Sequence, residues 1–443
     1  MRRLALIAFL SLIVLPIGGW LAAGRPLLRV GSLLLGGPRL EQPTIVLTVL
    51  DTVRADHLGV CGYERPIGTF LMRLVEEEGA SITCDARAPG SWTLPSHASF
   101  FTGDHVVAHG AHPVAGGGEL LAHTKEQVRP LPSGVPTLAE QLAARGYQTV
   151  AVVENPVISE ASGLLRGFEH VVRAGTWLSF EDNDNTQRAV TRLLKKVLDP
   201  ERPLFLFLNV AGAHQPWPAV AKDAPKYFPR RPALRLYGSK EDSLWRTFLR
   251  DEMTTGARAE FLEHLVDVYD YGVWREERTL RRVWHRLTKL GWTRSARLVV
   301  TSDHGEFLGE GGLLDHGHYL DDPNSRVPLM YWSSDEQVAL PRVVSGVVAY
   351  HLARDGALPA ELPRVESVAF PHPERFAWSE GRFFGSTSAG IWDEHGVSMW
   401  VDGEVAGPGG GAVTELAERA VLSAEGAGSA ALLEVLRTAG YVE

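Results

Sequence analysis

This chain of 443 residues has few cysteines and no excess of positive charge. Its two cysteines, Cys61 and Cys84, stand in no CxxC or other spacing typical of a zinc finger. Either they form one disulfide in an oxidising compartment or they are two small unpaired core residues, and we favour the unpaired alternative. The net charge is −9, and no basic stripe is evident along the sequence. Both observations argue against a nucleic-acid partner.

The longest uncharged run lies near the N-terminus, directly after two arginines. It covers residues 4–24, and about 20 apolar residues are enough to cross a bilayer. The arginines would stay in the cytoplasm, which places the rest of the chain outside, in the periplasm or the extracellular space. A cleaved signal peptide, and hence a secreted protein, is the alternative. We expect residues 1–24 to be an anchor or signal peptide and residues 25–42 to be a linker.

Apolar, β-branched runs alternate with helical patterns through most of the chain. The runs are typical of strands that are buried on both faces of a parallel sheet, and they cover residues 44–50, 149–153, 204–208, 298–301 and 327–331. Helices are predicted over residues 70–78, 137–145 and 259–290. This alternation predicts a doubly wound, mostly parallel α/β domain over residues 43–335. Residues 336–443 are predicted to form a small α+β subdomain, with a strand at 397–401 and a last helix at 430–439.

Polar residues that follow the predicted strands are candidates for a metal site, because ligands gather beyond the carboxyl ends of such strands. Asp51, Asp303 and His304 lie there. Two carboxylates and one imidazole suit Mn²⁺ or Zn²⁺, and less decisively Ca²⁺ or Mg²⁺. A lone Asp in this position is more often a helix cap or a turn former. The residues alone therefore leave the metal site open.

Three segments, in this order, resemble the sulfatase family of the alkaline phosphatase superfamily. They are LDTVRADHLG at 50–59, GSWTLPSHASFFTG at 90–103 and TSDHGEFLGE at 301–310. The resemblance covers most of residues 43–335. It implies that Asp51, Asp303 and His304 bind one divalent metal ion, with the Thr93 oxygen as a further ligand.

Thr93 departs from the family pattern at the nucleophile. In sulfatases this position is Cys or Ser, which is oxidised to formylglycine, whereas oxidation of a threonine could give only a ketone. Pro95 predicts a helix start, so Thr93 would lie beside helix N–H groups that favour a bound anion. The alternative is that Thr93 merely caps this helix. With the resemblance, we favour a threonine nucleophile for phosphoryl chemistry.

Further candidate residues are also implied by the resemblance. His214 and His318 match histidines of the active site and are predicted to be catalytic, and the neighbouring His316 is predicted to bind substrate. Two more predicted substrate contacts stand where sulfatases have other residues: His97 replaces an arginine, and Asn155 lies where many of them have a lysine segment. Thr52 likewise stands in place of a second Asp.

The expected function is therefore a metal-dependent hydrolase of phosphate or phosphonate esters that acts on an anionic ester substrate. A membrane-anchored transferase of phosphoethanolamine or phosphoglycerol groups is one alternative. A non-catalytic, sulfatase-like binding protein is another. Hydrolysis of sulfuric esters is less expected, because the formylglycine hydrate cannot form at Thr93.

Overall fold

The computed structural model describes residues 42–114, 127–174, 184–236, 244–317, 320–369 and 388–407, apart from single positions, and a few residues between 412 and 419. The predicted anchor or signal peptide, the linker up to residue 41, His318 and the last predicted helix lie outside the described residues. Among the described helices, none combines the length and apolar character that a membrane span requires.

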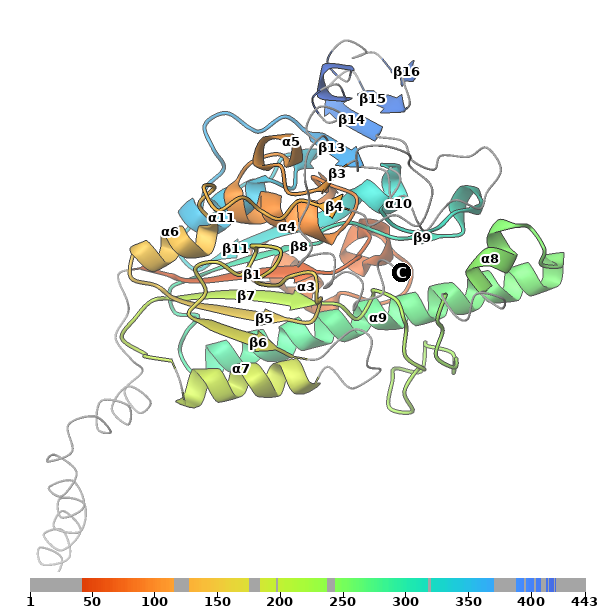
Figure 1. Cartoon of the computed structure of the whole chain (residues 1–443). Coiled ribbons are helices and arrows are strands. Elements are labelled where there is room, and N and C mark those ends of the chain that lie inside the picture. The colour runs from red at the N-terminus through yellow and green to blue at the C-terminus, as the bar shows by residue number, and fades with distance from the viewer. Residues whose placement is uncertain are drawn as a thin grey trace, which may run out of the picture.

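The centre of the fold is an eight-stranded mixed sheet in the order β12-β2-β11-β8-β1-β7-β5-β6, shown in Figure 1. The five strands from β8 to β6 are parallel, whereas β11 runs antiparallel to both of its neighbours. The strand bounds are β1 (Thr44–Leu50), β2 (Ser81–Arg87), β5 (Gln148–Val153), β6 (His170–Arg173), β7 (Leu204–Val210), β8 (Ala296–Thr301), β11 (Arg326–Ser333) and β12 (Val344–Ser345). All five strands predicted for this sheet are confirmed.

Helices cover both faces of this sheet, as Figure 1 shows. One face packs against α3 (Thr69–Glu76), α7 (Asp184–Lys196) and α9 (Thr255–Lys289), and the other against α4 (Thr93–Thr102), α6 (Leu138–Ala144) and α11 (Val348–Asp355). The side chains of β1 alternate between the two cores: Val46 belongs to the first and Leu47 to the second. The doubly wound α/β prediction is confirmed.

Short elements complete the large domain. They are η2 (Ala55–His57), η3 (Gly59–Cys61), η4 (Glu310–Gly312), α5 (Val106–His109), α8 (Leu244–Leu249), α10 (Asp322–Ser325), β3 (Pro113–Val114), β4 (Gln127–Val128), β9 (Phe307–Leu308) and β10 (Leu314–Asp315). The strand β9 pairs with β10 and the strand β3 pairs with β4.

A second sheet of four antiparallel strands follows the large domain. It consists of β13 (Glu366–Ala369), β14 (Ser388–Asp393), β15 (Gly396–Val401) and β16 (Glu404–Ala406). Its first strand contacts the chain just before the segment that contains Thr93, because the Val368 N–H donates to Pro89 O at 3.2 Å. The predicted strand at 397–401 is part of it. Although β12 and α11 come after residue 335, they join the large sheet and its core.

The two cysteines form a disulfide, contrary to our preference for unpaired residues. Cys61 at the end of η3 is bonded to Cys84 in β2, with 5.7 Å between their Cα atoms. The sequence could not decide this, because only the fold brings residues 23 positions apart to bonding distance.

Candidate active site

The carboxyl ends of β1 and β8 bring the three predicted metal ligands together. These strands are parallel neighbours, with Val49 opposite Thr301, so the residues that follow them meet at one edge of the sheet. Asp51 follows β1 directly, and Asp303 lies two residues beyond β8. The backbone N–H groups of Thr52 and His304 both donate to Asp303 Oδ1 at 3.1 Å.

The remaining polar atoms of this cluster fit a cation. Asp51 Oδ1, Asp303 Oδ2 and His304 Nε2 are buried and have no hydrogen-bond partner among the described residues. The three side chains offer ligand atoms within 4.8 Å of one another. Unpaired buried polar atoms are costly, and a divalent ion would satisfy all three. The donor set of two carboxylates and one imidazole therefore fits a divalent ion.

The charges of the two carboxylates also favour a cation. Burial, and then the nearby Asp303 carboxylate, raises the pKa of Asp51 to about 7. Burial alone would raise the pKa of Asp303 as well, but His304 and His97 outweigh it and hold that pKa below its usual value. Two acids forced together in this way repel each other when both are ionised. A bound cation would remove this repulsion.

Thr93 is the first residue of α4 and does not cap it. The N-cap is Trp92, and no side chain makes a capping hydrogen bond there. The Thr93 hydroxyl is instead turned toward Asn155, whose Nδ2 donates to Thr93 Oγ1 at 3.1 Å. The same Nδ2 donates to Asp51 Oδ2 at 2.9 Å. One amide therefore ties the candidate nucleophile to a candidate metal ligand.

Asn209 is a site residue that our sequence reasoning missed. Its Nδ2 donates to Asp51 Oδ2 at 2.9 Å, and its Oδ1 accepts the backbone N–H of Asn155 at 2.9 Å. It therefore holds both Asn155, the partner of the Thr93 hydroxyl, and Asp51 in place. Asn209 is the one polar residue of the otherwise apolar strand β7, which is the signal that could have revealed it.

His97 is completely buried behind Thr93. Its Nδ1 lies 2.9 Å from Thr93 O, one helical turn earlier, and 3.5 Å from Asp303 Oδ2. Its ring lies edge-on against Phe100 and Phe207. Burial lowers the pKa of His97. These contacts place His97 beneath the candidate nucleophile, where it supports the first turn of α4.

Three histidine rings lie in a row at the site. His304 stacks on His316 with ring centroids 4.3 Å apart, and His214 meets His316 edge-on at 5.0 Å. Burial, and then the adjacent His316, lowers the pKa of His214 to about 3. His316 differs, because Glu306 and Asp315 outweigh burial and raise its pKa to about 10. The predicted partner His318 lies outside the described residues, so only His316 is placed at the site.

Two buried carboxyl groups hold the loop that carries His214. The Ala211 N–H donates to Glu154 Oε2 at 3.0 Å, and the Ala213 N–H donates to Glu276 Oε1 at 2.6 Å. Burial raises the pKa of Glu276 well above its usual value. This loop also packs on Gly272 of α9, and sequence reasoning did not predict these contacts.

We expect Mn²⁺ or Zn²⁺ to stabilise the full chain after treatment with a chelator. Binding at a concentration of about 100 Kd adds about 2.7 kcal/mol to the free energy of unfolding, which a thermal melt measures directly. Asp303→Asn should abolish this stabilisation, because one of the three ligands is lost. The matched control is Asp223→Asn, which changes an exposed carboxylate and should keep the full effect. Equal stabilisation of both variants would contradict the metal assignment.

Comparison with known proteins gives the family. The sulfatase family model matches residues 43–352. No curated protein matches the chain. The fold is similar to that of phosphonate monoester hydrolase of Agrobacterium radiobacter, with a TM-score of 0.57 and 14% identity over 82% of this chain and 88% of that one. It is also similar to BT1596, a 2-O GAG sulfatase, with a TM-score of 0.55 and 15% identity over 90% of this chain and 93% of that one.

Identities this low support likeness of fold only. The family model, by contrast, matches well over half of the chain. Together with the buried Asp51, Asp303 and His304 cluster, the match confirms the resemblance seen in the sequence. The chain belongs to the sulfatase family of the alkaline phosphatase superfamily.

Proposed function

We propose that this protein hydrolyses phosphate or phosphonate esters through Thr93 as nucleophile. The observation that carries the proposal is the environment of Thr93 Oγ1, which accepts a hydrogen bond from Asn155 beside the buried Asp51. A threonine cannot give the formylglycine hydrate that sulfuric ester hydrolysis uses in this family. Its alkoxide can attack phosphorus, as activated alcohols do in covalent catalysis.

The reaction would proceed in two displacements. A divalent metal held by Asp51, Asp303 and His304 would supply positive charge that lowers the pKa of the Thr93 hydroxyl. Thr93 Oγ1 loses its proton and forms a bond to phosphorus, and the leaving oxygen departs with its bonding electrons and takes up one proton. Water then attacks phosphorus and loses one proton, while the departing Thr93 Oγ1 takes one up, which releases the product and restores the enzyme.

The chain's own groups would stabilise the charge that develops. Asn155 Nδ2 donates to Oγ1 and so favours the alkoxide. Thr93 is the first residue of α4, and the backbone N–H groups of a helix N-terminus favour a bound tetrahedral anion. Positive charge on His316, sustained by Glu306 and Asp315, supports a role in binding the anion or protonating the leaving oxygen. His214 is neutral and is suited to packing and positioning beside it.

We also propose that the catalytic domain lies outside the cytoplasm, tethered by residues 1–24 or released after their cleavage. The uncharged run in those residues supports this placement. The disulfide between Cys61 and Cys84 supports it independently, because such bonds persist mainly in oxidising compartments.

A panel of aryl esters tests the activity. The full chain is loaded with Mn²⁺ or Zn²⁺ and given a phosphate monoester, a phosphodiester, a phosphonate ester and a sulfate ester of one phenol. We expect the phosphorus esters to turn over fastest. Dominant sulfate release would contradict the proposal. If the phosphorus-containing group is transferred to added glycerol or ethanolamine in preference to water, the protein is a transferase instead.

A further inference from the structure

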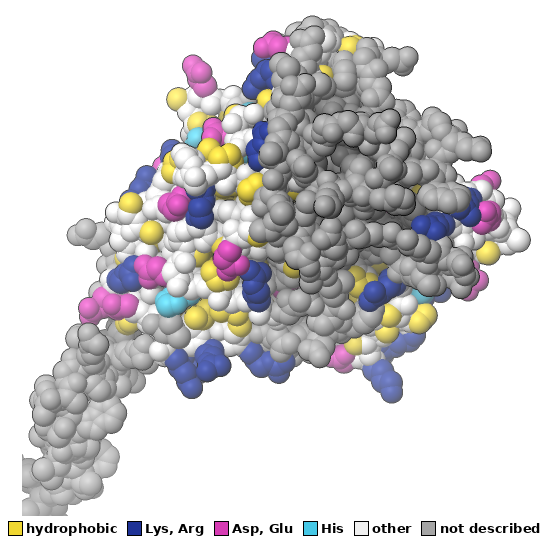
Figure 2. All heavy atoms as spheres, in the orientation of Figure 1, with side chains coloured by type: hydrophobic (Ala, Val, Ile, Leu, Met, Phe, Trp, Pro, Cys, Tyr) yellow, Lys and Arg dark blue, Asp and Glu magenta, His cyan; other side chains and the backbone are white. Residues whose placement is uncertain are grey.

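One surface of the large domain is strongly basic. It is formed by α7 and α9, which pack side by side, and we call it the basic surface. One hollow of about 570 Å³ on it is lined by Arg188, Arg192, Lys195, Lys196, Arg282, Arg286 and Lys289, with Thr191 and His285. No carboxylate is among these lining residues. Figure 2 shows dark-blue side chains gathered along the lower edge of the molecule, over α7.

The concentration of charge on this surface is at odds with the composition of the whole chain. Residues 185–196 and 278–289 contain nine Lys and Arg and no Asp or Glu, whereas the chain as a whole has a net charge of −9. The sequence showed no basic stripe because these two segments are far apart along it. Only the packing of α7 against α9 merges them into one surface.

Helix electrostatics alone do not account for these cations. Basic residues in the last turn of a helix interact favourably with its dipole, which applies to Lys195, Lys196 and Lys289. Arg188 and Arg192 come earlier in α7, at a spacing of four residues, where like charges destabilise a helix. Arg192 and Lys195 are exposed and form no ion pair with any residue that the structure describes. Positive charges that are held close together repel one another, and an anionic partner would relieve this repulsion.

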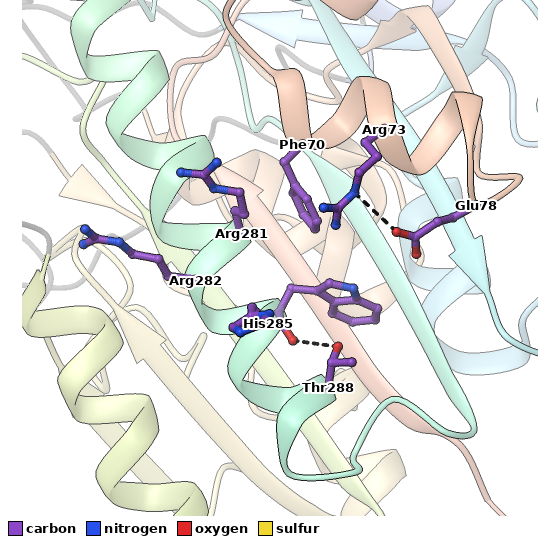
Figure 3. A pocket seen from close by; sticks show the side chains of 8 residues that line it. Phe70, Arg73, Glu78, Arg281, Arg282, His285 and Thr288 are labelled. Atoms are coloured by element: carbon purple, nitrogen blue, oxygen red, sulfur yellow. Dashed lines mark hydrogen bonds and ion pairs between the residues drawn. The ribbon is translucent and has the colours of Figure 1, made fainter. Parts of the chain in front are cut away.

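A second hollow adjoins the first and shares Arg282 and His285 with it. Its volume is about 420 Å³, and Phe70 and Trp284 form part of its lining. Figure 3 shows Arg281 and Arg282 projecting from α9, while Arg73 comes from α3 and pairs with Glu78. Arginines beside aromatic side chains suit a ligand that combines an anionic group with apolar parts.

The basic surface extends to the edge of the sheet that lies opposite the candidate active site. The helices α7 and α9 lead into the amino ends of β7 and β8, whereas Asp51, Asp303 and His304 lie at the carboxyl ends. The described chain begins at the same amino edge, where the Thr44 N–H donates to Ser295 O at 2.8 Å. Ser295 comes six residues after Lys289, so the start of β1 and the basic surface are close together.

The uncharged run therefore lies within reach of this surface. Residues 25–42 connect it to β1, and about 18 residues span at most about 60 Å when fully extended. If residues 4–24 insert into a bilayer, the headgroups are the nearest extended anionic surface. Lys and Arg near anionic lipid are attracted within about a Debye length.

We propose that the basic surface of α7 and α9 binds a bilayer that contains anionic phospholipid. The contact orients the domain with the amino edge of the sheet toward the membrane. The Thr93 site then faces away from the bilayer, toward soluble esters. This proposal is independent of the reaction that Thr93 catalyses.

Chemical protection of lysines tests the proposal on the full chain. The protein is reconstituted in vesicles of phosphatidylcholine alone or with phosphatidylglycerol and treated with a membrane-impermeant acylating reagent. Mass spectrometry then compares Lys195, Lys196 and Lys289 with Lys222, an exposed lysine that belongs to neither α7 nor α9. We expect anionic lipid to reduce acylation of the three lysines several-fold relative to Lys222. Salt at about 1 M, where the Debye length is about 3 Å, should reverse this protection.

A charge-reversal variant provides the matched control. Arg188→Glu with Arg192→Glu leaves all reporter lysines in place and should lose the protection, while thermal melting checks that the fold persists. Equal acylation in both kinds of vesicle would overturn the proposal. A second outcome would also overturn the proposal: heparin or single-stranded DNA protects the lysines in neutral vesicles, whereas anionic lipid does not. That outcome would assign the surface to a soluble polyanion.

Discussion

Replacing Thr93 with alanine is expected to lower the rate of ester turnover by about 10⁴-fold or more. The variant removes the oxygen that would form the bond to phosphorus, and losses of this size are typical when a nucleophile is deleted. Metal binding should persist, because Asp51, Asp303 and His304 remain. The measurement is kcat for the best phosphorus ester of the panel, with bound metal determined in parallel.

Two control variants make this result specific. Thr93→Ser keeps a hydroxyl in the same place and should retain most of the activity. Thr102→Ala removes a buried hydroxyl at the other end of α4, where it donates to Ala98 O at 2.9 Å, and should leave kcat unchanged. Turnover that survives in Thr93→Ala would refute the nucleophile assignment. Phosphate trapped on a peptide that contains Thr93 would support it independently of the rates.

Gly272→Ala, which adds a methyl group to α9, is expected to destabilise the protein and to displace the loop that carries His214. A Cβ atom there would lie 2.2 Å from Gly212 O and 2.8 Å from Ala213 Cα, so either α9 or the loop must shift. Overpacking of this kind costs about 1–3 kcal/mol. Since displacement by about 1 Å can lower a rate about 100-fold, we also expect a large loss of kcat. Chemical unfolding and the ester assay measure the two effects.

Gly256 of the same helix supplies the matched control. No atom lies within 4 Å of a Cβ built there, so Gly256→Ala should only raise helix propensity. Since Gly256 is the second residue of α9, the gain should be below the about 0.5–1 kcal/mol typical of a helix interior. The two alanine substitutions are thus expected to change the free energy of unfolding in opposite directions. If Gly272→Ala were as stable and active as Gly256→Ala, α9 would not position the His214 loop.

Most of the fold and part of the site were accessible from the sequence. The strands β1, β5, β7, β8 and β11 were predicted because each is a short apolar run, and α6 was predicted from a helical pattern that ends before Gly146. Asp51 and Asp303 stood out as polar residues directly beyond such runs. Their meeting follows from parallel pairing alone, which is why a local pattern was sufficient.

The rest of the site depends on contacts between distant segments. Glu276 lies 63 residues from Ala213, whose N–H it accepts. Its spacing from Val273 and Leu280 places it on the buried face of α9, but that spacing does not name the group it accepts from. The pairing of Cys61 with Cys84 and the basic surface of α7 and α9 were missed for the same reason. In each case, packing brings together residues that are distant in the sequence, and the local sequence does not indicate which residues meet.

The sequence by itself determined the layered α/β fold, the order of the strands along the chain and the residue types at the carboxyl edge of the sheet. These follow from local periodicity and from the motifs around Asp51, Thr93 and Asp303. Only the tertiary structure decided what each of these residues contacts. It showed that Asn155 joins Thr93 to Asp51, that buried carboxyl groups hold the His214 loop and that two helices combine their cations on one surface. The physical reason is that burial, pairing and charge density depend on distances in space, which strand and helix patterns do not encode.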